Sequence, residues 1–402
     1  MVLQRSLPVL IVLFLTGAML RMPWLVIFSG AILLFLLIAL VLRRFALIDV
    51  NYHRHWHYRR GFPGEETNLQ IEIENRKLLP LTWLRVSDQW PLSAAPIDRQ
   101  TLSPSNLVDQ GQLVNALSLK PREKVTRSYP IRFRKRGVYT VGPVDLETSD
   151  LFGLFPVDKR FAYPETLTVF PTILPLSALH LPADDPFGDR SAQRRLFEDP
   201  TQPMGVRPYQ PDDDFRRVHW PATARTGSVQ IKVYQPVTSH VLTVCLNVTT
   251  ADRAWLGTNQ DLLEGLINVA ASTCYHAFYR GYAVGLVSNG CLSHADHPFQ
   301  IAPGRSTNQL AALLESLSAV TAYTNASFET FLIKSLPKIP YGSTLLLVTA
   351  VMPDLLIDTL MRLKKYRPHT SLISLAETPP PTLPGIQTIH LPFSQELLSN
   401  DH

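Results

Sequence analysis

Carboxylates, guanidinium groups and an imidazole gather in one short segment near the middle of the chain. Three consecutive aspartates are followed there by arginines, a histidine and a lysine, namely Asp212–Asp214, Arg216, Arg217, His219, Arg225 and Lys232. Adjacent carboxylates repel one another unless basic groups or a cation neutralise them, and guanidinium groups can do so through bidentate pairs. The segment therefore predicts a turn held together by ion pairs.

Two other hypotheses stay open for the same segment. A hard cation could be bound, although at most two of three consecutive carboxylates on an extended chain can converge on it. A metal-dependent hydrolase could use Asp213 and Asp214 with His219 as an acid/base cluster. No nucleophile accompanies that cluster, because neither Thr226 nor Ser228 has an obvious His and Asp partner in the sequence.

The wider segment carries a pattern of aromatic, acidic and basic residues. It is Y-x-P-x-D-D-x-R-x-[VI]-x-W, followed by A-R-x-G and a basic strand, which resembles the signature of domain-of-unknown-function family 58. The matching residues are Tyr209, Pro211, Asp213, Asp214, Arg216, Arg217, Val218, Trp220, Ala224, Arg225, Gly227 and Lys232. Two positions depart from the family pattern, because Asp212 stands where a glycine is usual and Gln235 where an acidic residue is common.

The resemblance has implications for the whole chain. The family comprises bacterial membrane proteins typically encoded beside MoxR-type AAA+ ATPases. It implies two N-terminal membrane segments, a β domain, the signature, and a C-terminal domain similar to von Willebrand factor A. The implied role is that of a membrane-anchored scaffold or adaptor working with an ATPase of the MoxR type.

A domain similar to von Willebrand factor A often coordinates Mg²⁺ through D-x-S-x-S, a later Thr and a further Asp. Here the corresponding residues are Asn247, Thr249, Ala251, Thr307 and Ala350. Without the two carboxylates, nothing offsets the dehydration of a small divalent ion. We therefore expect no metal and no cofactor, and we expect Thr307 to cap a helix that begins near Asn308.

Apolar residues dominate the N-terminal segment. Trp24 to Leu42 is uncharged over 19 residues and would reach about 28 Å as a helix, which predicts a transmembrane span. Leu7 to Leu20 is a shorter apolar run, and a turn at Arg21 and Pro23 would make the two a hairpin, so that residues 7–42 lie in the bilayer. A cleavable signal peptide is the alternative for the first run, which lacks an A-x-A-like cleavage site.

The basic flanks predict the orientation of this segment. Five arginines follow the second run, namely Arg43, Arg44, Arg54, Arg59 and Arg60, against Arg21 alone in the hairpin turn. By the positive-inside rule the remainder of the chain is cytoplasmic, in a multi-pass protein of the bacterial inner membrane. An extracellular adhesion module would need the opposite topology.

Three histidines after the second apolar run lie two residues apart. On a strand His53, His55 and His57 would share one face and could hold zinc. No carboxylate or cysteine completes such a site in the sequence. The alternative is an aromatic and basic collar at the lipid headgroups.

The rest of the chain divides by its hydrophobic periodicity. Residues 46–171 alternate as in an all-β sandwich, with Leu69, Ile71 and Ile73 on one face of a strand. The segment RSYPIRFRKRGVYTVGPVDLET is expected to form two strands joined at Gly137. Residues 172–240 are a connector that carries the signature, and Thr172 to Arg207 is expected to have little core. Residues 241–402 alternate strands and helices, which predicts a doubly wound α/β domain with a mainly parallel sheet.

Composition and charge limit the function classes. Only 18% of the residues are charged, below the ~25% of ordinary soluble domains. The net charge of +5 is too small to indicate a nucleic-acid groove. The odd number of cysteines, Cys245, Cys274 and Cys291, lacks metal-ligand spacing and is typical of a reducing compartment. We therefore expect a non-enzymatic interaction protein that does not bind nucleic acid, with the ion-paired segment at the junction of its two folded domains.

Overall fold

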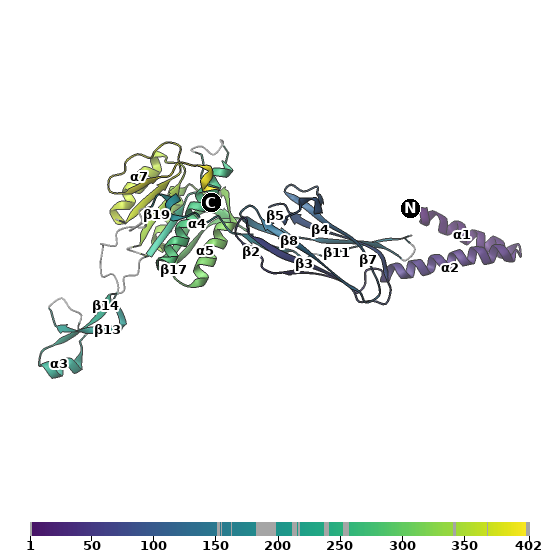
Figure 1. Ribbon diagram of the computed structural model, residues 1–402, viewed down its shortest axis with the longest axis horizontal. Coiled ribbons are helices and arrows are strands. Elements are labelled where there is room, and N and C mark those ends of the chain that lie inside the picture. Colours follow the sequence, from purple (N-terminus) through teal and green to yellow (C-terminus); the bar gives the residue numbers. More distant parts are fainter. Residues whose placement is uncertain are drawn as a thin grey trace. The chain divides into compact units, whose positions relative to one another are not determined.

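The computed structural model describes most of the chain, in two compact units (Figure 1). The described residues are 2–150, 153, 155–161, 163–181, 198–210, 215, 218–236, 241–251, 257–340, 343–367 and 369–398. The first unit comprises Met1–Phe170 and the second Pro171–His402. Each unit is considered by itself below.

Two helices begin the first unit: α1 from Val2 to Met19 and α2 from Pro23 to Phe45. They pack closely, since a Cβ added at Gly17 would lie 3.0 Å from the Leu25 side chain. Among the described residues, α2 is the one helix long and apolar enough to cross a membrane, with a hydropathy of 3.1. It runs three residues beyond the predicted Leu42, so that Arg43 and Arg44 form its last turn.

The strands of the first unit form three sheets. One has the order β1 (Val50–Trp56), β3 (Glu66–Asn75), β8 (Lys124–Phe133), β5 (Ala94–Pro96). The second has the order β11 (Pro156–Phe161), β10 (Val144–Ser149), β4 (Leu81–Pro91), β7 (Gln110–Leu119), β6 (Leu102–Pro104). A small third sheet has the order β2 (Arg60–Gly61), β12 (Glu165–Val169), β9 (Gly137–Val141). A 3-10 turn, η1 (Arg99–Thr101), precedes β6.

The core of this β unit lies between its sheets. The predicted alternation in β3 is confirmed, because Leu69, Ile71 and Ile73 are all at most 1% exposed. They share one apolar cluster with Trp90 and Phe133, which are fully buried. Each such side chain contributes about 1.5–3 kcal/mol through its removal from water.

The prediction of two strands joined at Gly137 is wrong, because this segment forms three strands: β8, β9 and β10. β8 pairs with β3 and β5, β9 with β12, and β10 with β4 and β11. The additional break falls at Gly142, where φ is +100°, and at Pro143. A proline has no N–H to donate and a positive φ turns the chain, so a single strand cannot continue through this dipeptide.

The second unit contains a mainly parallel sheet, as predicted. Its order is β17 (Ala295–Gly304), β16 (Ala283–Leu292), β15 (Val241–Leu246), β19 (Thr344–Thr349), β20 (Thr370–Ser374), β21 (Gln387–His390). β17 and β18 (Val320–Thr324) both pair antiparallel to β16, and the other neighbours are parallel.

Helices connect these strands, which makes this an α/β unit. They are α4 (Gln260–Tyr279), α5 (Thr307–Ala319), α6 (Phe328–Ser335) and α7 (Asp354–Tyr366), with short 3-10 turns η2 (Leu176–Leu179), η5 (Leu336–Lys338) and η6 (Gln395–Leu397). The predicted helical spacing is confirmed in α4, where Leu263, Leu266 and Ile267 are buried. Cys245 and Cys274 are buried too, as expected of core thiols.

The expectation of little core at Thr172–Arg207 is wrong for residues 172–181. The backbone N–H of Thr172 donates to Asn268 Oδ1 at 3.0 Å, and that of Leu174 to Ser272 Oγ at 2.8 Å, which fastens this stretch along α4. Leu174 and Leu179 are at most 1% exposed. Further on, β13 (Glu198–Pro208), α3 (Trp220–Thr226) and β14 (Gln230–Pro236) form a hairpin.

Candidate functional site

The signature segment lies on the β13–α3–β14 hairpin, which we call the signature hairpin. Pro211, Asp213, Asp214, Arg216 and Arg217 lie outside the described residues, so the predicted ion pairs between them stay a prediction. The flanking chain is described: β13 and β14 pair antiparallel, and the N–H of Tyr209 donates to the carbonyl of Val229 at 2.9 Å. Lys232 pairs with Val206 in this ladder, and Arg225 lies exposed on α3.

The short helix α3 is fixed by caps at both ends. His219 Nδ1 accepts a hydrogen bond from the N–H of Ala222 at 3.0 Å, which places the imidazole at the helix N-terminus. Gly227, at φ +69°, ends the helix in the left-handed conformation that glycine adopts readily. The Thr223 hydroxyl accepts from the N–H of Gln230 at 3.0 Å and ties the helix to β14.

These caps give His219 a structural role. Its Nδ1 is occupied by the helix N-terminus, and its backbone N–H donates to the carbonyl of Gln230 at 2.7 Å. A hydrolytic cluster with Asp213 and Asp214 would have to rely on Nε2 alone. The alternative hypothesis of a hydrolase stays a prediction, because the two carboxylates are outside the described residues.

Aromatic side chains of the hairpin face outward. Trp220 is 69% exposed and Phe215 66% exposed, and the ring of Phe215 lies 5.1 Å from that of Tyr209. A tryptophan with most of its surface in water contributes little to a core. The sequence identified Trp220 through the family pattern, but its outward orientation depends on the caps of α3.

Polar side chains also gather at the carboxyl end of the parallel strands of the α/β unit. Asn247 Nδ2 donates to Thr349 Oγ1 at 3.0 Å, and Asn289 Nδ2 donates to Asn247 Oδ1 at 3.2 Å. Asn289 Oδ1 in turn accepts from the N–H of Val248 at 3.0 Å. All three side-chain bonds join residues at least 40 positions apart, and we call this set the amide network.

The amide network occupies the edge at which the resemblance would place a metal. Asn247 and Thr249 take part in it, because the N–H of Thr249 donates to Asn247 Oδ1 at 3.1 Å. Ala350 is buried immediately after β19 and offers no ligand. Within the described part of the chain, no group of three or more His, Cys, Asp or Glu residues could hold a metal ion. The donors and acceptors at this edge are directed at one another.

The prediction that Thr307 caps α5 is wrong. Thr307 is the first residue of the helix, and Ser306 occupies the N-cap position without a side-chain cap bond. Ala251, the remaining residue of the predicted degenerate site, is half-buried beyond β15. Sequence reasoning missed Asn289 and Thr349, which lie on strands β16 and β19 and meet Asn247 only in the fold.

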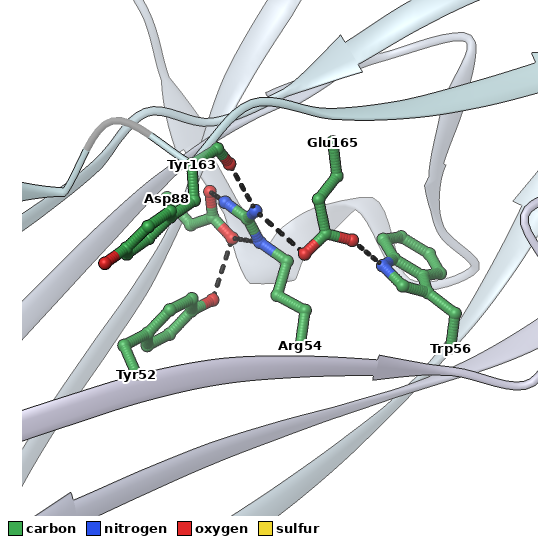
Figure 2. A network of polar contacts seen from close by, with 6 residues as sticks. All are labelled: Tyr52, Arg54, Trp56, Asp88, Tyr163 and Glu165. Carbon is green, nitrogen blue, oxygen red and sulfur yellow. Dashed lines mark hydrogen bonds and ion pairs between the residues drawn. The ribbon is translucent and has the colours of Figure 1, made fainter.

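The β unit contains a second, charged network (Figure 2). Arg54 from β1 and Asp88 from β4 form a bidentate ion pair, with Nη2–Oδ1 at 2.6 Å and Nε–Oδ2 at 2.9 Å. Both side chains are only 1% exposed. The Tyr52 hydroxyl donates to Asp88 Oδ2 at 2.8 Å, so the carboxylate accepts three hydrogen bonds.

The network continues to the neighbouring strand β12. Arg54 Nη1 donates to the carbonyl of Tyr163 at 3.0 Å and lies 3.7 Å from Glu165 Oε1, while Trp56 Nε1 donates to Glu165 Oε2 (Figure 2). The five donors of a guanidinium suit such a branched arrangement. The network therefore links strands β1, β4 and β12.

Burial and charge shift the titration of this network. Burial, together with the charge of Asp88, raises the pKa of Tyr52 well above its ordinary value. Burial also raises the pKa of the Asp88 carboxyl, against the opposing bonds from Arg54. For Arg54 the bonds to Asp88 outweigh burial and raise the pKa. Because Arg54 bonds both oxygens of Asp88, the pair serves as a structural link between β1 and β4.

Comparison with known proteins finds a family model that matches part of the chain. Residues 205–367 match the family described as "Protein of unknown function DUF58". The match begins within β13, includes the hairpin and α4, and ends beyond α7. It therefore covers the signature hairpin and most of the sheet with the amide network.

One relative of the chain is the uncharacterized protein YeaD of Bacillus subtilis (strain 168). It is 23% identical over 260 residues, which are 65% of this chain and 61% of the relative. The match thus spans less than two thirds of the length of that curated relative. Like the DUF58 description, its name assigns no activity.

Solved structures resemble parts of the chain weakly. A CARDB domain of Pyrococcus furiosus, in complex with di-metal ions, has a TM-score of 0.20 at 10% identity and covers 30% of this chain and 92% of its own. The sporulation control protein Spo0M of Bacillus subtilis has a TM-score of 0.19 at 11% identity, covering 30% and 49%. At these TM-scores the likeness supports no argument about function.

The three histidines that follow α2 lie on the surface of the β unit. His53 and His55 are exposed on β1, with ring centroids 6.3 Å apart, and His55 Nε2 lies 3.4 Å from Glu72 Oε2. Lys124 Nζ is bonded to the same carboxylate at 2.7 Å and, as the largest cause, lowers the pKa of Glu72. The carboxylate near the histidines is thus already engaged by an ammonium group.

The headgroup collar stays a prediction, but the structure places the last residues of the sequence after α2 at the far end of β1. Strand β1 leads away from α2, since Val50 pairs with Asn75 and Trp56 pairs with Leu69. At about 3.4 Å per residue, Trp56 lies roughly 20 Å further along than Val50. His57, Arg59 and Arg60 follow Trp56 and therefore lie at the end of the β unit remote from α2.

These remote residues line an open cavity of about 650 Å³. Its walls are Trp56, His57, Tyr58, Arg59, Arg60, Thr166 and Thr168. The lining has basic groups and hydroxyls and no carboxylate, so the cavity disfavours cations. Trp56, which forms one wall, is held in place by its bond to Glu165.

Proposed function

We propose that this chain is a membrane-anchored interaction protein in which the signature hairpin presents aromatic residues to a protein partner. The observation that carries the proposal is the 69% exposure of Trp220 on a helix that is capped at both ends. Phe215 of the same hairpin is 66% exposed, and tryptophan is enriched among the residues that dominate binding energy. DUF58 residues 205–367 include this helix.

The hydrogen bonds that hold α3 in place support this proposal. Because α3 is tied to β14 through Thr223 and Gln230, a partner that binds Trp220 would pay little entropy to order the helix. The segment 205–236 also contains five basic residues and three aspartates, so polar contacts can surround the aromatic ones. The basic residues are Arg207, Arg216, Arg217, Arg225 and Lys232.

We further propose that α2 is the anchor and that α1 forms a membrane hairpin with it. In support, α2 has 23 residues and places Arg43 and Arg44 in its last turn. The positive-inside rule then favours a cytoplasmic location for the two units, in the bacterial inner membrane. The exposed apolar surface of α2, including Ile27 and Phe28, also suits lipid better than water.

The proposed partner is an AAA+ ATPase of the MoxR type, because the signature resembles that of proteins encoded beside such ATPases. The C-terminal unit would then act as a metal-free binding domain similar to von Willebrand factor A. The amide network supports a metal-free role, since its amides and hydroxyls satisfy one another without a carboxylate.

The proposal is tested by photo-crosslinking in native membranes. A photoreactive amino acid replaces Trp220 in the full chain, and a second version carries it at Tyr323, an equally exposed residue of β18 at 69%. We expect a specific crosslinked protein from position 220 that is absent from position 323. An AAA+ ATPase in that product would support the named partner, and equal crosslinking from both positions would contradict the proposed surface.

A further inference from the structure

A different surface of the β unit lies next to the C-terminus of α2. Lys77, in the loop between β3 and β4, directs its ammonium group at the last carbonyls of the helix, those of Phe45, at 3.2 Å, and Ala46. The N–H of Arg76 donates to the carbonyl of Asp49 at 3.0 Å. The helix end and this loop are therefore joined directly.

A second loop, between β7 and β8, lies at the same end. The N–H of Arg122 donates to the carbonyl of Lys77 at 3.2 Å, and Asn75 Nδ2 donates to the carbonyl of Lys120 at 3.0 Å. Asn75 is fully buried, so this link between the two loops is well protected from water. Two loops more than 40 residues apart in sequence thus surround the emerging helix.

The side chains of this end combine exposed cations with exposed apolar groups. The cations are Arg43, Arg44, Arg76, Lys120 and Arg122. The apolar groups are Phe45 at 47%, Ile48 at 46% and Leu78 at 70% exposure. We call these eight residues the juxtamembrane rim.

Carboxylates in the same loops are fewer and mostly engaged. Glu74 accepts from Arg76 Nε at 2.7 Å, and Glu123 accepts from the N–H of Lys120 at 2.6 Å. Asp49 is exposed between α2 and β1. The rim therefore keeps an excess of positive charge.

The length of α2 sets the depth of the rim. A helix of 23 residues reaches about 34 Å, slightly more than the ~30 Å hydrocarbon core of a bilayer. Its last turn, with Arg43 and Arg44, would then emerge at the phospholipid headgroups. The loops fastened to that turn by Lys77 lie at the same level.

We propose that the juxtamembrane rim binds the headgroups of anionic phospholipids. This inference rests on the proposed membrane anchoring by α2. Arginine recognises phosphate through paired hydrogen bonds, and each basic residue near an anionic bilayer contributes about 1 kcal/mol. Leu78 and Ile48 are placed to enter the boundary between headgroups and acyl chains.

Lys77 has a different role from the rim arginines. Burial lowers its pKa to about 8, and its ammonium group is directed at the carbonyls that end α2. A cation there complements the negative end of the helix dipole. Lys77 therefore connects the helix to the rim and does not itself contact lipid.

The experiment uses the full chain with a Leu78→Cys substitution carrying an environment-sensitive dye. The native thiols Cys245, Cys274 and Cys291 are buried, and burial raises the pKa of each, so the dye reacts selectively at position 78. The protein is reconstituted into phosphatidylcholine vesicles and into vesicles that also contain phosphatidylglycerol. Brominated lipids in both vesicle types measure contact by quenching.

We expect stronger quenching in the vesicles with phosphatidylglycerol, and loss of that increase in an Arg76→Glu/Arg122→Glu variant. The matched control is Arg59→Glu/Lys135→Glu, which changes the same charge at the remote end of the unit and should keep the increase. Equal quenching in both vesicle types, or an unchanged increase in the rim variant, would overturn the inference.

Flotation of the same samples separates this inference from the proposed anchoring. If the chain floats with both vesicle types but the dye quenching does not depend on phosphatidylglycerol, lipid binding by the rim is contradicted and the anchoring by α2 is not. A chain that fails to float overturns both.

Discussion

The two units of this protein bury polar groups of different kinds. The β unit buries a full ion pair, Arg54 with Asp88, and surrounds it with a tyrosine hydroxyl and a backbone carbonyl. The α/β unit buries neutral amides and hydroxyls, with Asn247, Asn289 and Thr349 bonded to one another. Both networks join strands that are distant in the sequence.

The two networks differ in how much stability the fold would lose when one bonding partner is removed. Deleting half of a buried ion pair leaves an uncompensated charge, which costs about 3–5 kcal/mol. Deleting one amide leaves unsatisfied neutral groups at about 1–3 kcal/mol. The Arg54–Asp88 pair and the amides of Asn247 and Asn289 are buried, so both networks stabilise the fold, whereas the surfaces proposed for partners are the signature hairpin and the juxtamembrane rim.

The largest expected effect is that of breaking the charged network. Replacing Arg54 with Ala should destabilise the β unit by about 3–5 kcal/mol, because Asp88 keeps its burial and loses its counter-ion. Chemical denaturation of the detergent-solubilised protein measures this change. Arg160→Ala is the control, since its ion pair with Asp145 at 2.7 Å is exposed to water and should contribute far less to stability than the buried pair. Equal losses in the two variants would contradict the assignment of Arg54.

High pH provides a second test, directed at the α/β unit. Burial raises the pKa of both Cys245 and Cys274 to about 12 from an ordinary value of 9.0. Because the folded pKa is the higher one, the stability contributed by the neutral thiols is complete below pH 9 and is lost as the pH rises toward 12. The loss is about 1.4 kcal/mol per pH unit for each thiol, or about 3 kcal/mol for both at pH 10.

Denaturation at pH 8 and pH 10 measures this slope, and Cys274→Ala should reduce the contribution of the thiols by about half. Burial also raises the pKa of Tyr52, so the β unit should lose stability only above about pH 10, where a tyrosine of the unfolded chain begins to ionise. A pH-independent α/β unit between 8 and 10 would show that these thiols are not protected by the fold.

A smaller effect is expected from the amide network. Asn289→Ala removes the acceptor for the Val248 N–H and the donor to Asn247, and should destabilise the α/β unit by about 1–3 kcal/mol. Thermal or chemical unfolding monitors the change. Asn308→Ala, at an exposed position of α5, should change the stability by less than about 0.5 kcal/mol. If neither substitution changed the stability, the amide network would not stabilise the α/β unit.

Local patterns predicted the regular elements well. The alternation of Leu69, Ile71 and Ile73 placed β3 and its buried face, and the apolar spacing in residues 261–279 placed α4. β13 was missed because its sequence, EDPTQPMGVRP, contains three prolines and few β-branched residues. It is ordered by pairing with β14, which the sequence of β13 alone does not reveal.

The candidate sites were predictable only in part, because their contacts are long-range. Arg54 and Asp88 are 34 positions apart, and nothing local to either residue indicates the other. The sequence supported Arg54 as a membrane-flanking cation, whereas the fold buries it in an ion pair. The sequence likewise does not show that β1 carries Arg59 and Arg60 away from α2.

The smallest effect on stability is expected at the residue proposed to matter most for function. Trp220 is largely in water, so Trp220→Ala should change the free energy of unfolding by less than about 0.5 kcal/mol. The same substitution should remove a hot spot of about 2 kcal/mol or more from a partner interface. We therefore expect Trp220 to affect binding and not stability, whereas Arg54 affects stability.

Stability and partner binding at Trp220 can be measured on one pair of proteins. Wild-type and Trp220→Ala chains are purified from native membranes under identical conditions, and the unfolding free energy and the amount of co-purified partner are determined for each. We predict equal stability and a loss of the partner from the variant. A variant that retains its partner in full, or that loses stability by several kcal/mol, would contradict the account.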